Sequence, residues 1–118
     1  MMIQQGGRVP HNKTRVYGIT FDSKAEANRY LELRHQLKRG EISDLILQPK
    51  FDLIPSARIP HRKALRAHSY TADFQYVRNG KIVVEDVKSA YTRTHRDYII
   101  NRKLMWFLKG IYVEEVIR

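Results

Sequence analysis

Apolar and polar positions follow a helical period in two parts of the chain. Apolar residues spaced three or four apart follow Ser23 and Glu26, whose spacing is that of an N-terminal capping box, and Gly40 ends the pattern. We therefore predict a first helix over residues 23–39. A second helical pattern predicts another helix over residues 94–108.

Runs rich in β-branched and aromatic residues predict strands between and after these helices. They lie at residues 45–48, 51–54, 70–77, 81–87 and 111–117. This order favours an α/β domain with a mixed central β-sheet flanked by helices. Residues 1–16 are largely polar and carry only basic charges, so we expect a basic flexible arm before a single domain over residues 17–118.

The pair Asn79-Gly80 separates two of the predicted strands and is a strong hairpin signal, because both residues tolerate the positive φ of a type I′ turn. With these two residues as the loop, Asp73 lies directly opposite Asp86. Opposed residues have Cβ atoms ~4.5–5.5 Å apart, so the two carboxylates need a compensating cation or a shared proton. Alternation places Lys88 on the same sheet face as the two acids.

Two carboxylates and a lysine on one sheet face have the composition of a phosphodiester-cleaving site. Mg²⁺ is typically held by one or two carboxylates plus water and substrate phosphate, and a lysine supplies positive charge beside the developing phosphorane. An ordinary salt-bridged patch is the alternative. Glu85 points to the opposite face, where we expect a salt bridge, or a role as metal ligand if the strand register slips by one.

The charge balance indicates the kind of partner. The 118-residue chain has 22 Lys and Arg against 12 Asp and Glu, a net charge of +10 with neutral histidine. This excess points first to nucleic acid, while an anionic membrane, a ribosomal setting or a merely solubilising surface also fits the charge alone. Residues 56–69 form the densest basic stretch, with no acid, and Arg62, Lys63 and Arg66 are its candidate phosphate contacts.

Features of several other protein classes are missing from the sequence. It has no cysteine, hence no disulfide framework and no thiolate metal site. Its five histidines lack close ligand spacing, which argues against zinc. It contains neither a signal-peptide core nor a run of about 18 apolar residues. We therefore expect a soluble cytoplasmic protein that has no membrane partner.

Five blocks of the chain, in order, resemble a known group of nucleases. They are YGITFDSKAEANRYLEL (17–33), LQPKFDLIP (47–55), YTADFQYV (70–77), VVEDVKS (83–89) and NRKLMWF (101–107). Over about residues 13–118 the chain resembles the PD-(D/E)XK nuclease superfamily, to which Holliday junction resolvases are related. More narrowly, it resembles a family of small phage and prophage proteins assigned to that superfamily. The resemblance implies a restriction-endonuclease-like core with the order α-β-β-β-α-β.

The resemblance also implies roles for single residues. Asp73 matches the first acid of the motif, Asp86 the second acid and Lys88 the lysine. The residue before Asp73 is Ala72, where the motif often has proline. By this resemblance the two aspartates and the carbonyl of Val87 would bind Mg²⁺ or Mn²⁺, and Lys88 would position or help activate the attacking water.

Three further residues are site candidates. Glu26 is explained by a capping box alone, but it also matches the extra acid that many members bring toward the metal. Gln48 lies where related nucleases often place a polar residue near the metal or DNA, and Lys103 is a candidate DNA contact because it lies in a shared block. The helical spacing of Trp106 and Phe107 places their rings in the core rather than against nucleobases.

The function implied by the resemblance is a Mg²⁺-dependent endodeoxyribonuclease that hydrolyses double-stranded or branched DNA in phage recombination or replication inside a bacterial cell. One alternative is a non-catalytic DNA-binding module that keeps the nuclease fold. Another is an RNA- or ribosome-associated protein, which leaves Asp73 and Asp86 without a role. Related resolvases are dimers, and a two-fold enzyme can cut two strands symmetrically, so a homodimer is a further hypothesis.

Overall fold

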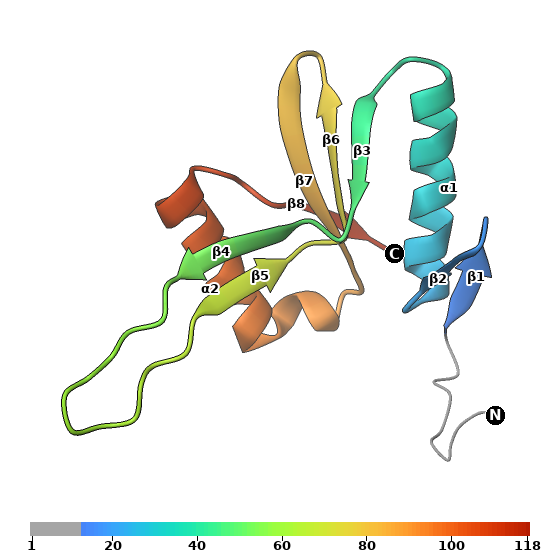
Figure 1. Cartoon of the computed structure of the whole chain (residues 1–118). Helices are drawn as coiled ribbons and strands as arrows, with labels where there is room; N and C mark the ends of the chain where they lie inside the picture. Colours follow the sequence, from blue (N-terminus) through green and yellow to red (C-terminus); the bar gives the residue numbers. More distant parts are fainter. Residues whose placement is uncertain (1–12) are drawn as a thin grey trace.

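A four-stranded mixed sheet with one helix on each face forms the body of the molecule (Figure 1). This computed structural model describes residues 13–118, and residues 1–12 of the predicted N-terminal arm lie outside them. The helices are α1 (Lys24–Lys38) and α2 (Arg96–Leu104). Among the described residues, no helix has the length and apolar character that crossing a membrane requires. The predicted α/β class with a mixed sheet and two helices is confirmed.

Eight strands form three sheets within the described part of the chain. They are β1 (Thr14–Val16), β2 (Ile19–Phe21), β3 (Ser43–Leu47), β4 (Lys50–Ile54), β5 (His68–Thr71), β6 (Phe74–Arg78), β7 (Lys81–Lys88) and β8 (Glu114–Ile117). The main sheet has the order β3-β6-β7-β8, in which β7 and β8 are parallel and the other neighbours antiparallel. Strands β1 and β2 form a hairpin, so the last residues assigned to the arm belong to a folded element.

The hairpin of β6 and β7 has the predicted turn and register. Asn79 and Gly80 have φ values of 52° and 75°, as a type I′ turn requires. Arg78 pairs with Lys81, and the ladder continues in this register as far as Glu85. The position of Asp73 opposite Asp86 follows from this pairing.

Helix α1 begins and ends at the residues that its sequence signals indicate. The Ser23 hydroxyl accepts a hydrogen bond from the backbone N–H of Glu26 at 3.1 Å. At the other end, Gly40 has a φ of 76°, and its N–H donates to the carbonyl of Leu37 at 3.1 Å. The next residue, Glu41, donates back to the last turn at 2.9 Å, which completes a Schellman motif.

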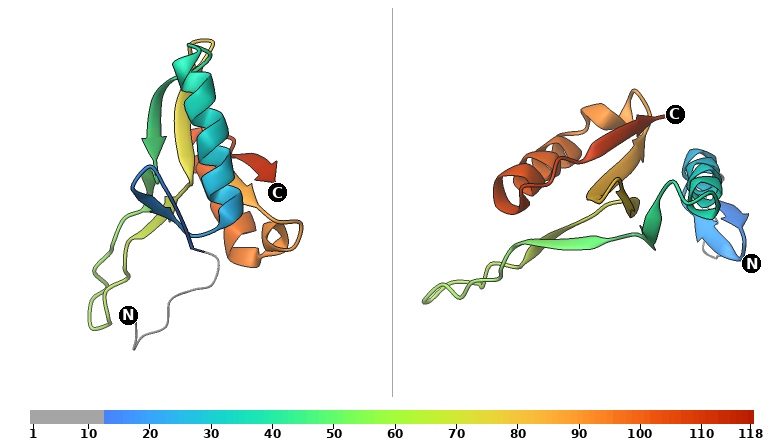
Figure 2. Two further views of the ribbon diagram at one scale, coloured as in Figure 1. Left: turned by 90° about the vertical axis from the view of Figure 1, so that its right-hand side faces the viewer. Right: turned by 90° about the horizontal axis from the view of Figure 1, so that it is seen from above.

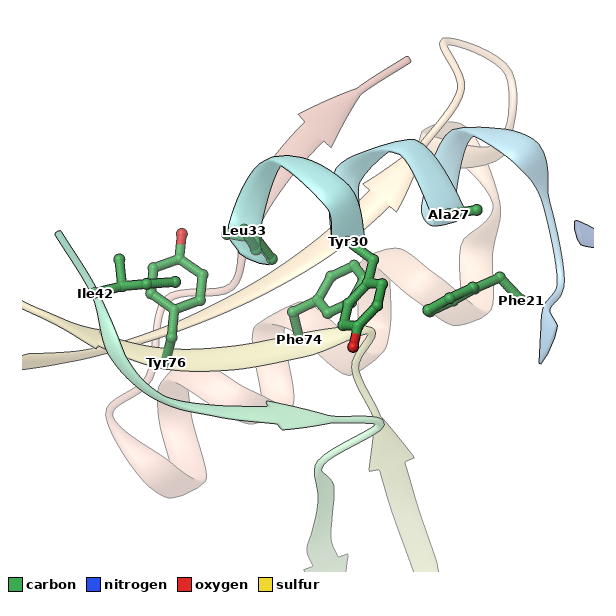
Figure 3. Packing of buried hydrophobic residues seen from close by; sticks show 7 residues of the cluster. All are labelled: Phe21, Ala27, Tyr30, Leu33, Ile42, Phe74 and Tyr76. Atoms are coloured by element: carbon green, nitrogen blue, oxygen red, sulfur yellow. The ribbon is translucent and has the colours of Figure 1, made fainter. Parts of the chain in front are cut away.

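Two apolar clusters hold the helices to opposite faces of the sheet. On the α1 face, Phe21, Tyr30 and Phe74 form the aromatic centre (Figure 3), with Tyr30 and Phe74 stacked at 6.3 Å between ring centroids. On the other face, Met105 and Val84 are almost completely buried among residues from β4, β5 and the C-terminal part of the chain.

The predicted strand at residues 70–77 is divided between two sheets. Thr71 pairs with Lys50 of β4, whereas Phe74 pairs with Leu47 of β3. Gln48 and Asp73 lie opposite each other at this break, and the backbone N–H of Gln48 donates to the carbonyl of Asp73 at 3.0 Å. The pairing register is therefore the same on both sides of the break. Strands β4 and β5 therefore continue the β3–β6 pair as a two-stranded extension beyond the main sheet (Figure 1).

The second helix is shorter than predicted and changes its winding. A 3₁₀ turn, η1 (Thr92–Thr94), precedes α2, and a π-helical turn, η2 (Met105–Lys109), follows it. A π turn has more residues than an α turn, so it shifts the phase of the helical period. The expectation that Trp106 and Phe107 are core residues is wrong, because they are 53% and 80% exposed and Met105 takes the buried position.

Candidate active site

A cleft of about 390 Å³ opens where β6 begins and β7 ends. Glu26 from the first turn of α1 lines it together with Asp73, Val87 and Lys88. Asp86 lies beneath this surface with only 2% of its area exposed. Three of the four acids and bases that the sequence singled out for chemistry therefore line the cleft, and the fourth, Asp86, joins them through its contacts with the Asp73 N–H and Lys88.

The carboxylate of each aspartate accepts a hydrogen bond from the backbone of the opposite segment. The N–H of Asp73 donates to Oδ1 of Asp86, and the N–H of Val87 donates to Oδ2 of Asp73, each at 2.8 Å. The Tyr70 hydroxyl donates to Oδ2 of Asp86. Because each carboxylate accepts about four hydrogen bonds, both aspartates keep lone pairs for a further ligand.

Lys88 lies beside the buried acid on the predicted face. Its Nζ is 3.9 Å from Oδ2 of Asp86 and 4.7 Å from the centroid of the Tyr98 ring. Its side chain is 25% exposed, so it extends from the buried acid toward the open cleft. This position offsets part of the negative charge of Asp86, and part of the Lys88 side chain stays exposed at the cleft.

The environment of the aspartates favours a proton or a cation between them. Burial raises the pKa of Asp73 to about 7, and the negative charge of Asp86 adds to this effect. Burial also raises the pKa of Asp86, although the hydrogen bond from Tyr70 and the charge of Lys88 lower it in part. Two carboxyl groups in one buried site cannot both ionise without cost, so the pair attracts positive charge near neutral pH.

Glu26 turns its carboxylate to the cleft while its backbone is capped by Ser23. The side chain is almost fully buried and accepts a hydrogen bond from Nε2 of Gln48 at 3.2 Å. Burial raises the pKa of Glu26, and repulsion from Asp22 and Asp86 raises it further. The helix cap and the position in the cleft are therefore compatible roles of one residue.

Gln48 has a strained backbone next to the cleft. Its φ of 54° is in the left-handed region, which costs energy for a residue other than glycine. This conformation lets its N–H bond the carbonyl of Asp73 while its side chain reaches Glu26. Backbone strain of this kind often marks functional sites. Here the strained conformation lets Gln48 connect Asp73 to Glu26.

The oxygen donors of the cleft suit a hard divalent cation. Within residues 13–118, no three Asp, Glu, His or Cys side chains are already arranged as a metal-binding group. Mg²⁺ needs only one or two carboxylates from a protein, because it keeps several waters and binds substrate phosphate. Asp73 and Asp86 meet that requirement, and burial raises the pKa of both carboxyl groups.

The comparisons with known proteins assign the chain to a family. The model of one family, described as "Protein of unknown function (DUF1064)", matches residues 9–114. The chain belongs to the DUF1064 family. No curated protein matches it. The matched region includes Glu26, Asp73, Asp86 and Lys88, so the whole constellation lies inside the DUF1064 domain.

Glu85 of this DUF1064 chain has a structural partner on the opposite sheet face. Its two carboxylate oxygens accept hydrogen bonds from Arg29 at 2.7 and 2.9 Å, and the Tyr76 hydroxyl donates at 2.7 Å. The expected salt bridge is confirmed. The strand register does not slip, so Glu85 points away from the cleft.

The predicted DNA contacts lie outside the cleft of the DUF1064 domain. Arg62, Lys63 and Arg66 are exposed beyond the ends of β4 and β5. Lys103 instead lines a groove of about 550 Å³ with the exposed rings of Trp106 and Phe107. Among the predicted contacts, only Gln48 reaches the acids.

Some residues at the cleft were not found from the sequence. Tyr70 on β5 reaches Asp86 on β7 because the chain passes from one sheet to another between β5 and β6. No local sequence pattern predicts this change of sheet. Arg118 lines the cleft because β8 runs parallel to β7. The side chains of Ser89 and Thr92 accept hydrogen bonds from each other's backbone N–H groups, at 2.8 and 3.0 Å. Their spacing of three residues is a sequence signal for this capping contact.

Proposed function

We propose that this protein is a metal-dependent endodeoxyribonuclease of the PD-(D/E)XK type. The observation that carries the proposal is the placement of Asp73, Asp86 and Lys88 on one face of a hairpin, at a cleft that Glu26 also lines. The raised pKa values of the acids are typical of groups tuned for function.

The order of elements supports a restriction-endonuclease-like core. Helix α1 is followed by antiparallel strands that carry the acids, then by α2 and by β8, which lies parallel to β7. Strands β4 and β5 are set apart as a separate two-stranded sheet. From α1 onward, the remaining helices and strands (α1, β3, β6, β7, α2 and β8) have the α-β-β-β-α-β order of the resembled superfamily.

In the proposed mechanism, the protein's own residues bind, orient and hold protons. Asp73 and Asp86 would hold Mg²⁺ or Mn²⁺ with the Val87 carbonyl, and Glu26 would complete the site directly or through water. A cation there would supply Lewis-acid chemistry toward the phosphate and the attacking water. Lys88 would orient that water and offset the negative charge that develops on the phosphate.

Replacement of single residues tests the proposal. Asp86→Asn and Lys88→Ala should each lower Mg²⁺-dependent cleavage of plasmid and four-way-junction DNA by about 100-fold or more, because each removes a group that acts on the reacting phosphate. DNA binding and the circular dichroism spectrum should not change. Matched controls are Asp44→Asn on β3 and Lys81→Ala on β7, both at exposed positions away from the cleft.

Two results would count against the proposed nuclease activity. Cleavage that persists in Asp86→Asn and Lys88→Ala would show that the activity comes from another site or a contaminant. Tight DNA binding by the unaltered protein without cleavage of linear, nicked, flapped or four-way DNA, in Mg²⁺ and Mn²⁺, would favour a non-catalytic DNA-binding module.

A further inference from the structure

A long two-stranded extension projects from the body of the molecule (Figure 2). It consists of residues 50–71, namely β4, β5 and the segment between them, and we call it the basic ribbon. Every residue from 54 to 68 is exposed. Four of these residues are Arg58, Arg62, Lys63 and Arg66, and no acid lies between Asp52 and Asp73.

The basic ribbon is held by its own hydrogen bonds well beyond the regular strands. Ala57 and Leu65 exchange two backbone hydrogen bonds at 3.0 and 2.8 Å, and the N–H of Arg62 donates to the carbonyl of Ile59 at 3.1 Å near the tip. Its base is fixed by Leu53 and Tyr70, which are buried in the second apolar cluster. The cations are therefore presented by an organised hairpin.

The basic ribbon also begins at the candidate site. Gln48, which contacts Glu26, lies just before β4, and Asp73 follows β5 after a single residue. The backbone bonds Gln48 N–H to Asp73 carbonyl and Ala72 N–H to Pro49 carbonyl, both 3.0 Å, join the two segments at this point. The direction of the ribbon is thus fixed relative to the acids.

We propose that the basic ribbon lies along a groove of duplex DNA and contacts the phosphates on one side of the bond to be cut. This inference rests on the proposed nuclease function. About ten residues separate Lys50 from the tip, and at ~3.3 Å per residue they reach ~30 Å, close to one turn of B-DNA. The major groove is wide enough for a two-stranded ribbon.

The composition of the ribbon favours duplex over single-stranded DNA. Proteins that bind single strands use aromatic rings as stacking platforms, but residues 54–68 contain no Phe, Tyr or Trp. Residues 53–72 also lack Asn, Gln, Asp and Glu, which read base edges together with Arg. Arg is therefore the main residue type in the ribbon that could read a base edge, and we expect its Arg and Lys side chains to contact phosphate, which positions the duplex without selecting its sequence.

The test compares two triple variants of the full chain with equal net charge. The first, Arg62→Ala/Lys63→Ala/Arg66→Ala, removes the ribbon cations. The second, Lys38→Ala/Lys81→Ala/Lys109→Ala, removes three exposed cations elsewhere. Binding to a 30-base-pair DNA duplex, a 30-nucleotide single strand and an RNA duplex is measured by fluorescence anisotropy in EDTA at several salt concentrations.

The ribbon variant should bind the DNA duplex at least tenfold more weakly, and its slope of log K against log salt should fall by about 3. The control variant should lose much less affinity. Equal losses in both variants, unchanged duplex binding, or tighter binding of the single strand or RNA duplex would overturn the inference. Because EDTA prevents metal-dependent cleavage, failure of the nuclease proposal would appear separately, as absent cleavage by the unaltered protein in Mg²⁺.

Discussion

At the scale of single residues, Asp73 should make stability depend on pH near neutrality. Burial beside Asp86 raises its pKa to about 7, against about 3.9 in an unfolded chain. Between these values the folded state binds more protons, so the free energy of unfolding falls as pH rises. The stabilisation is fully present below the unfolded pKa and is lost as pH rises through about 7.

Asp73→Asn should remove this dependence. In EDTA at pH 8, urea unfolding should show it to be more stable than the unaltered protein by on the order of 1–3 kcal/mol, with little difference at pH 4. Asp44→Asn, at an exposed position, should leave the pH profile unchanged. A profile for Asp73→Asn that parallels the unaltered protein would show that Asp73 does not hold the proton.

Arg29 and the buried Glu85 form an ion pair that should stabilise the fold without acting in the site. Arg29→Met leaves the Glu85 carboxylate, which is 1% exposed, with the Tyr76 hydroxyl as its remaining bonded partner. We expect a loss of about 3 kcal/mol in urea unfolding, because an unpaired buried charge is costly.

The double variant Arg29→Met/Glu85→Gln should recover most of this loss, since the neutral amide no longer needs a cation. Arg39→Ala, which breaks an exposed pair with Glu41, should have little effect. If the single and double variants were equally unstable, the loss would come from packing of the arginine stem.

The acid pair could be predicted from the sequence because two local rules determine it. Turn chemistry at Asn79 and Gly80 fixes the register, and alternation along β7 then fixes the face of Asp86. The contact of Tyr70 with Asp86 depends instead on how the chain passes between two sheets. Local patterns contain no information on such a path.

At the scale of elements, the type I′ turn should tolerate few residues. Gly80 has a φ of 75°, and a Cβ placed there would meet no atom within 4 Å. Gly80→Ala should therefore cost about 1 kcal/mol in urea unfolding through backbone strain alone. Gly80→Asn should cost less, because asparagine adopts left-handed conformations more readily.

Both variants should keep the same register, because β6 and β7 are also paired along their length and packed on both faces. An alanine variant as stable as the asparagine variant would show that the turn relaxes to another type.

Sequence periodicity predicts elements well where one local pattern dominates. Helix α1 has a cap, an apolar face and a glycine stop that agree with one another. The predicted strand at residues 70–77 fails because its β-branched and aromatic content does not change where the pairing partner changes from β4 to β3. The helix at residues 94–108 fails at its end because a π turn shifts the phase.

At the scale of the whole molecule, the basic ribbon lengthens the protein and places cations away from the acids. The radius of gyration is 16.9 Å, against about 13 Å for a compact domain of this length, and the longest extent is 55 Å. The extension separates cations at its tip from the acids at its base. Under the proposed function, a molecule with net charge +10 would therefore contact phosphate with the ribbon and hold a cation at its base.

A divalent cation should stabilise the whole fold through this site. A ligand that binds only the folded state raises the free energy of unfolding by about 1.4 kcal/mol at ten times its Kd, which corresponds to a rise in Tm of about 5 °C. Mg²⁺ or Mn²⁺ should produce such a rise in thermal unfolding of the unaltered protein. The effect should be larger at pH 8 than at pH 6, because protons compete for Asp73 below its pKa of about 7.

Asp86→Asn should abolish the rise in Tm, while Asp44→Asn should keep it. A rise of equal size in Asp86→Asn would place the bound cation elsewhere on the protein. This measurement needs no DNA, so it separates the metal site from catalysis. If a cation stabilises the fold only when Asp73 is ionised, then proton binding, metal binding and folding all depend on the Asp73–Asp86 pair.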